Sequence, residues 1–301
     1  MSNDVENCPA EEFIKLCFAD DSGKNGHKFW ENFAKLRVDV WEKDCPKIYN
    51  YKNSYDALPD PDVNSYNLYE AHIRVWNIQH KKFNIKDIKR NGRCRCEIIT
   101  EDEQVILGSD SIMSIYWHRT YGNMPEIMKK ISQTKSNYKE FIKEYLKKAN
   151  TIGGFILFPR HANSINQRRG RKPFDDRFDL ALECIRRSFM NESFSSYNPL
   201  FNISAEDKDF FRMFGEGKAG FEKYAEFFCL NGSWVENGKV LNLLYNDENK
   251  DKTGRNAKTL DEWDFSQEPL PNSAEWWTFY RNIMNRLDAR NEQIKEVIEG
   301  K

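Results

Sequence analysis

Residues 151–159, TIGGFILFP, form a short and continuously apolar run in the middle of the chain. A run of this length predicts a buried strand or another segment of the core. Residues 82–118 have strand character, and Asn91–Gly92 within them is a hairpin turn signal because both positions tolerate positive φ. These segments predict a small antiparallel sheet.

Helical spacing of apolar residues lies on both sides of the strands. The predicted helices cover residues 10–18, 27–41, 65–77, 125–149, 174–189, 204–214, 218–230 and 273–298. The pattern Ser204 to Asp207 is a cap at the start of one of them, and Asn231–Gly232 is a stop signal at the end of the next. Asn237–Gly238 is a second hairpin turn signal, and the polar residues 246–262 after it are expected to be irregular. Strands do not alternate with helices in a βαβ rhythm, so the predicted fold class is α+β, predominantly helical with a small antiparallel sheet. We expect an N-terminal helical extension and irregular connection over residues 1–61, then a single α+β domain over 62–301.

Positive charge is concentrated in one segment, residues 160–172, which contains no acid. Its cations are Arg160, Arg168, Arg169, Arg171 and Lys172. The whole chain has a formal net charge of −1, so it is not a polycation that coats nucleic acid. An anion site in this chain must therefore be local, and we call residues 160–172 the basic segment.

The seven cysteines are scattered, and the acidic N-terminal residues include no apolar signal region. No stretch approaches the roughly twenty apolar residues that span a membrane. The sequence therefore predicts a cytoplasmic protein with free thiols and no contact with a membrane. It identifies no cofactor.

Three segments resemble an uncharacterised bacterial protein family of unknown function. They are the apolar run 151–159, Ile165–Asn166 with Arg169–Gly170, and Asp176–Arg187. The resemblance extends over about residues 62–298, although only the central part is specific. It implies that the basic segment and the helix after it form a signature, and it implies no mechanism.

The basic segment predicts a site for a phosphate-bearing ligand, either a nucleotide or a short nucleic acid. Guanidinium groups grip phosphate with two parallel hydrogen bonds, and amide side chains suit a base or a sugar. The candidate ligand-binding residues are Arg160, Asn163, Asn166, Gln167, Arg169, Arg177 and Arg186, and the candidate proton-transfer residues are Glu183, Asp179 and His161. A transferase or nuclease acting as a toxin or a phage-defence effector would fit this pattern, but no motif fixes a reaction.

A second interpretation is a non-enzymatic structural or protein-interaction domain, in which the Arg, Asp and Glu residues of the signature form a buried polar network that fixes the fold. A simpler interpretation of the acids on this helix is a set of salt bridges on its surface. Asp179, Glu183 and Arg187 follow one another at i, i+4 and i+8, the usual spacing of salt bridges on a solvated helix face. The aromatic residues of 210–228 are expected to pack between two helices. Surplus rings there could contact a protein partner or a second copy of the chain.

Other polar residues have simpler interpretations. Cys94 and Cys96 lack a second cysteine pair with ligand spacing, so no metal site is predicted. His72 lies on the apolar side of its helix and is expected to be a core histidine. Residues 108–111, GSDS, do not match the G-x-S-x-G elbow and are expected to form a bulge or turn. The lysines of 125–149 are expected to form a solvated face.

Overall fold

The computed structural model describes part of the chain in detail. The described residues are 66–80, 82–83, 85–92, 95–112, 133–137, 141, 144–145, 148, 151–161, 164–165, 177–192, 203–248, 254–263, 271–272 and 274–300. The helices predicted at 10–18 and 27–41 lie outside these residues, as do Arg168, Arg171, Lys172 and Cys94. Of the helix predicted at 125–149, too few residues are described to follow its lysine face.

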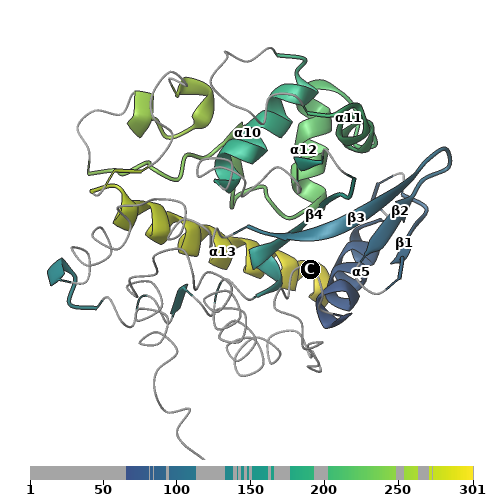
Figure 1. The fold of residues 1–301 in the computed structure, drawn as a ribbon, viewed down its shortest axis with the longest axis horizontal. Helices are drawn as coiled ribbons and strands as arrows, with labels where there is room; N and C mark the ends of the chain where they lie inside the picture. Colours follow the sequence, from purple (N-terminus) through teal and green to yellow (C-terminus); the bar gives the residue numbers. More distant parts are fainter. Residues whose placement is uncertain are drawn as a thin grey trace, which may run out of the picture.

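The long helix α13 (Trp276–Glu299) runs across the centre of the molecule in Figure 1. Three helices are grouped above it in this view: α10 (Phe178–Phe189), α11 (Ala205–Arg212) and α12 (Gly217–Phe227). The helix α5 (Tyr66–His80) and the sheet lie toward the C-terminal end of α13. The α+β prediction is confirmed.

The main sheet is antiparallel, with its strands in chain order. The strands are β1 (Asp87–Arg90), β2 (Cys96–Ile99), β3 (Gln104–Ser111) and β4 (Phe155–Pro159). All residues of β4 are buried, and a turn of 3₁₀ helix, η1 (Ile152–Gly154), precedes it. The prediction of a buried strand from the apolar run is therefore confirmed.

The edge of the sheet at β1 is covered by a side chain of α5. The amide oxygen of Asn77 accepts from the Ile88 backbone N–H at 3.1 Å, and its Nδ2 donates to the Ile88 carbonyl at 2.7 Å. These are the two backbone groups that a further strand would use at this position. Asn77 thus occupies that pairing position.

The prediction of a bulge or turn at residues 108–111 is wrong. The strand β3 continues through them, with Gly108 opposite Phe158 and Ser111 opposite Phe155 on β4. The serine at 109 is tolerated in a buried strand because its polar groups find partners: its backbone N–H donates to the Tyr69 hydroxyl at 2.8 Å, and its Oγ lies 3.0 Å from His72 Nε2.

The two Asn–Gly turn signals have different outcomes. Asn237 and Gly238 have φ values of 54° and 76° and join β5 (Val235–Glu236) to β6 (Lys239–Val240), as predicted. In the first hairpin, β1 is joined to β2 as the signal predicts, but Gly92 has positive φ, at 69°, and Asn91 does not; the Asn91 N–H donates to the Arg95 carbonyl.

The sequence signals for helix ends predicted the start of α11 correctly but not the end of α12. Ser204 caps α11, because its Oγ accepts from the backbone N–H of Asp207 at 3.1 Å, as predicted. The helix α12 ends at Phe227, before the predicted Asn231–Gly232 signal; Phe228 is its C-cap, and Cys229 takes the left-handed conformation with φ 54°. Part of the polar stretch 246–262 is ordered as 3₁₀ helix, in η4 (Gly254–Asn256) and η5 (Leu260–Glu262).

The aromatic residues of α11 and α12 pack in the core, as predicted. Phe214 and Phe228 are buried, and the ring of Phe228 lies 5.0 Å from that of Tyr224 and 5.3 Å from that of Trp76 on α5. Tilted and edge-to-face contacts of this kind stabilise the core beyond the burial of the rings themselves. The cluster thus joins α5 to the α11–α12 pair.

Two polar residues of α13 hold the segment before β4. The buried guanidinium of Arg290 donates to the carbonyl oxygens of Gly153 at 2.8 Å, Phe155 at 2.7 Å and Phe228 at 3.0 Å. The Asn291 Oδ1 accepts from the Gly153 N–H at 2.9 Å. A Cβ added to Gly153 would lie 2.4 Å from this oxygen, so the close approach requires glycine.

Gly153→Ala is therefore expected to destabilise the fold by roughly 1–3 kcal/mol, the usual cost of forcing an extra carbon into a packed site. Urea denaturation of the variant would measure the loss. In an Asn291→Ala background the same change should cost much less, because the clashing oxygen is gone. Equal costs in both backgrounds would contradict this explanation.

Candidate functional site

The basic segment begins where β4 ends. The Arg160 N–H donates to the Ile106 carbonyl at 2.9 Å, which extends the pairing of β4 with β3 by one residue. The Arg160 side chain lies over Gly108, whose missing Cβ would meet its Cδ at 3.1 Å. The side chain is only partly exposed, and none of the described carboxylates forms an ion pair with its guanidinium. Its charge is therefore not neutralised within the described part of the chain.

His161 follows Arg160 and contacts the first turn of α11. Its Nε2 lies 3.1 Å from the Oδ1 of Asp207 and 3.4 Å from the Ser204 Oγ. The other oxygen of Asp207 accepts from the Ile165 N–H at 3.1 Å. The carboxylate is fully buried, whereas the imidazole keeps 24% of its surface exposed. A buried carboxylate thus holds a partly exposed histidine beside Arg160.

Sequence reasoning assigned Asp207 only to the cap of its helix. The spacing Ser204 to Asp207 indicates a helix start and gives no sign of a contact with a histidine 46 residues earlier. The candidate residues Asn163, Asn166, Gln167 and Arg169 lie outside the described residues.

Asp179 is fully buried at the first turn of α10. Arg177 holds it with two hydrogen bonds, Nε to Oδ1 at 3.0 Å and Nη2 to Oδ2 at 2.5 Å. The Leu243 N–H also donates to Oδ2, at 2.9 Å. Arg177 is itself 3% exposed and lies over the Trp263 ring. The structure brings these two candidate residues together as a buried ion pair.

Glu183 is also fully buried and accepts from two arginines. Arg186 donates to both of its oxygens at 2.8 and 2.9 Å, and Arg187 donates to Oε1 at 2.7 Å. Burial tends to lower the pKa of Arg186, but hydrogen bonding and charge from Glu183, helped by Glu192, raise it overall. The Arg186 guanidinium thus forms its ion pairs with Glu183 and Glu192 of the same chain.

The prediction that these acids lie on a solvated helix face is wrong. The salt-bridge spacing is correct, but η5 and β6 pack against α10 and remove Asp179 and Glu183 from water. The ion pairs form the buried network of the second interpretation. This geometry favours a structural role for both carboxylates over proton transfer.

His72 is a core histidine, as predicted. The Trp76 Nε1 donates to its Nδ1 at 3.1 Å, so Nε2 carries the proton and donates to the Ser109 Oγ. The ring is therefore a donor to this serine and not its base. Burial, helped by the nearby charge of Arg290, lowers the pKa of His72 to about 3.

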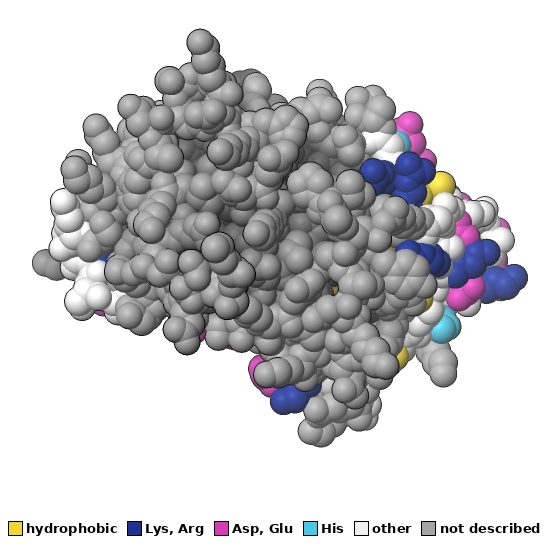
Figure 2. Space-filling view, turned by 60° about the horizontal axis from the view of Figure 1, so that its bottom comes forward, with side chains coloured by type: hydrophobic (Ala, Val, Ile, Leu, Met, Phe, Trp, Pro, Cys, Tyr) yellow, Lys and Arg dark blue, Asp and Glu magenta, His cyan; other side chains and the backbone are white. Residues whose placement is uncertain are grey.

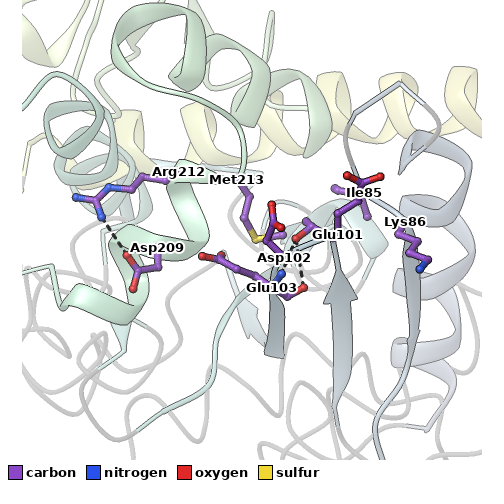
Figure 3. A pocket seen from close by; sticks show the side chains of 9 residues that line it. Ile85, Lys86, Glu101, Asp102, Glu103, Asp209, Arg212 and Met213 are labelled. Carbon is purple, nitrogen blue, oxygen red and sulfur yellow. Dashed lines mark hydrogen bonds and ion pairs between the residues drawn. The ribbon is translucent and has the colours of Figure 1, made fainter.

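A cleft of about 650 Å³ opens between the β2–β3 turn and the C-terminal end of α11 (Figure 3). Its lining comprises Ile85, Lys86, Thr100, Glu101, Asp102, Glu103, Asp209, Arg212 and Met213. Four carboxylates face two cations, and one of these cations, Arg212, pairs with Asp209 at 3.1 Å. The acidic lining repels phosphate and favours a cationic group. Sequence reasoning did not single out any of these residues.

Other classes of site find less support in the described residues. No group of three or more His, Cys, Asp or Glu side chains among them is arranged to hold a metal ion. Cys96, Cys184 and Cys229 are buried free thiols. No helix in the described ranges is long and apolar enough to cross a membrane.

The described surface is polar. In the view of Figure 2, basic and acidic side chains lie next to one another at its edge, with few hydrophobic ones. Ile78 of α5 is the large hydrophobic residue that is exposed within the described part of the chain. Binding of a protein partner or of a second copy of the chain therefore stays a prediction.

These features define an α+β protein whose signature helix is held by buried ion pairs, with a cationic and histidine-bearing end of β4. The chain belongs to DUF6994, a family of unknown function, whose family model matches residues 46–294. The membership agrees with the resemblance to an uncharacterised family and supplies no activity. Neither the curated proteins nor the solved structures that were compared contain a match.

The buried network predicts the effect of Glu183→Gln. Loss of the carboxylate leaves Arg186 and Arg187 without their shared partner, which should cost about 3–5 kcal/mol of stability. Glu192→Gln is the control, since Glu192 is 46% exposed and contacts the same Arg186; its cost should stay below about 1 kcal/mol. Denaturant titration distinguishes the two, and a stably folded Glu183→Gln variant would contradict the structural assignment.

The buried His72 predicts a pH dependence. An unfolded histidine gains its proton near pH 6.5, whereas folded His72 does so only near pH 3. Between these values the unfolded state binds the extra proton, so His72 makes the fold less stable as pH falls from 6.5 toward 3, by up to about 1.4 kcal/mol per pH unit. In His72→Gln this slope should become flatter by that amount, as measured by urea denaturation across the window. An unchanged slope would mean that His72 titrates normally.

Proposed function

We propose that the chain binds a phosphate-bearing anion at the end of β4, with Arg160 as the main cation and His161 beside it. The observation that carries the proposal is the partly buried side chain of Arg160, whose guanidinium forms an ion pair with none of the described carboxylates. A guanidinium removed from water needs charged or polar partners, and phosphate matches its geometry.

Comparison with the other arginines of the signature supports this choice. Arg177, Arg186 and Arg187 each hold a buried carboxylate. We therefore assign Arg177 and Arg186 to the fold and not to the ligand. Asn163, Asn166, Gln167 and Arg169 stay candidate ligand contacts on the strength of the sequence alone.

An enzymatic role would place proton transfer at His161, because Asp179 and Glu183 are saturated with hydrogen bonds inside the protein. A function as a toxin-like or phage-defence transferase or nuclease would require that the bound ligand is also turned over. Product analysis with the same ligands tests this finer proposal.

The second candidate is a non-enzymatic protein-interaction domain. The acidic cleft between the β2–β3 turn and α11 favours it, since carboxylates around the partly buried Met213 suit a basic peptide side chain with an aliphatic stem. A basic peptide therefore belongs in the ligand panel.

Arg160→Ala is expected to weaken phosphate binding at least tenfold without unfolding the chain. The measurement is the thermal shift of wild type and variant with inorganic phosphate, nucleotides, short RNA and DNA, and a lysine-rich peptide. A ligand at about 100 times its Kd stabilises by about 2.7 kcal/mol, or roughly 5 °C in a chain of this size.

Arg281→Ala, on the exposed side of α13, is the matched control and should bind like wild type. A wild-type chain that responds to no phosphate compound, or an Arg160→Ala variant that binds as tightly, would overturn the proposal. A response to the peptide alone would favour the interaction domain.

A further inference from the structure

Gly108 is the residue of β3 over which the Arg160 side chain lies. A Cβ built on Gly108 would have three nearest neighbours, and all three are atoms of Arg160: Cδ at 3.1 Å, Nη1 at 3.4 Å and Cγ at 3.6 Å. A side chain at position 108 would therefore press first on the arginine that we propose binds the anion.

The pairing of the strands explains why these two residues meet. The Arg160 N–H donates to the Ile106 carbonyl, so Arg160 lies opposite Ile106 across the pair of β3 and β4. Gly108 is two residues from Ile106 and faces the same side of the sheet. A diagonal neighbour in an antiparallel pair is within reach of a long side chain. The Arg160 side chain thus extends along β3 and crosses Gly108 with its aliphatic carbons and one guanidinium nitrogen.

The carboxylates on this face of the sheet leave Arg160 unpaired. The pairing of β2 with β3 puts Glu97 on the same face, but its carboxylate forms an ion pair with Lys89 at 3.2 Å and accepts from two amide side chains. Asp110 is the next residue of β3 on this face, and it forms no ion pair with Arg160. The Arg160 charge is therefore the one that an anion above β3 would meet within the described part of the face.

We propose that Gly108 is a positioning residue of the anion site, because the absence of a side chain there lets the Arg160 guanidinium lie across β3 and bind the anion on this face of the sheet. This inference rests on the proposed function. A guanidinium that is already ordered loses less rotamer freedom on binding, and a bidentate contact with phosphate depends on its orientation. A side chain at position 108 would take the space of the Arg160 carbons and turn the guanidinium away.

The effect should grow with the size of the side chain at position 108. Alanine adds only the Cβ, to which Arg160 can yield by a few tenths of an ångström. Valine adds two further methyl groups and must displace the arginine. Valine also favours strands, so the fold should tolerate it.

The contact is tested without a ligand, by thermal denaturation of a double-mutant cycle. In an Arg160→Ala background, Gly108→Ala removes a flexible glycine from a strand and should raise the Tm by about 2 °C. In the wild-type background, the tight contact with Arg160 should cancel most of this gain. Equal gains in both backgrounds would mean that the two residues do not restrain each other, and would overturn the inference.

Binding is tested by calorimetric titration of the full chain with inorganic phosphate. Gly108→Val should bind at least tenfold more weakly than wild type with its Tm preserved, and Gly108→Ala about threefold more weakly. The smaller change serves if the valine variant does not fold. Val105→Ile adds a methylene to the opposite face of the same strand and is the matched control, which should bind like wild type. In Arg160→Ala, a further Gly108→Val change should not alter the residual binding.

The outcomes separate the two proposals. Phosphate binding that is lost in Arg160→Ala but kept in the folded Gly108 variants would overturn the role of Gly108 and leave the anion site standing. An equal loss in Val105→Ile would also overturn that role, because it would mean that any added volume in β3 disturbs binding. A wild-type chain that binds no phosphate compound would overturn the proposed function and the inference with it.

Discussion

The guanidinium of Arg290 lies in the middle of the core, and three backbone carbonyls from two separate parts of the chain converge on it. Hydrogen bonds from a charged donor are worth about 1.5–3 kcal/mol each, and an unmade one costs a similar amount. Arg290 therefore fixes the position of α13 against both the turn before β4 and the end of α12. Because β4 is placed in this way, the point at which the basic segment leaves the sheet is placed as well.

The arginines of the signature differ in whether they pair with a carboxylate of the same chain. Those on α10 and at its start are used up by Asp179 and Glu183, which would otherwise be uncompensated charges in the core. Arg160 lies outside that network, directly after β4, whose residues are all buried and apolar. The two parts of the signature thus differ in role. The ion pairs of α10 stabilise the fold, and Arg160 at the end of β4 is the cation that we propose binds the anion.

What could be predicted from the sequence was mostly local. The burial of β4, the Ser204 cap and the Asn237–Gly238 hairpin depend on residues a few positions apart, and all three were predicted correctly. The burial of Asp179 and Glu183 depends on β6 and η5, which follow much later in the chain, and helical periodicity carries no information about them. The pairing of His161 with Asp207 and the acidic cleft likewise arise from segments that meet only in the folded protein.

The side-chain amide of Asn77 at the sheet edge has a consequence for the behaviour of the protein in concentrated solution. An open strand edge recruits the edge of another molecule, and such pairing is a common route to aggregation. At β1 the backbone groups of Ile88 are already satisfied from within the same chain. A strand of another molecule could pair here only after the Asn77 side chain had been displaced. The Asn77 amide therefore opposes fibre growth through the β1 edge.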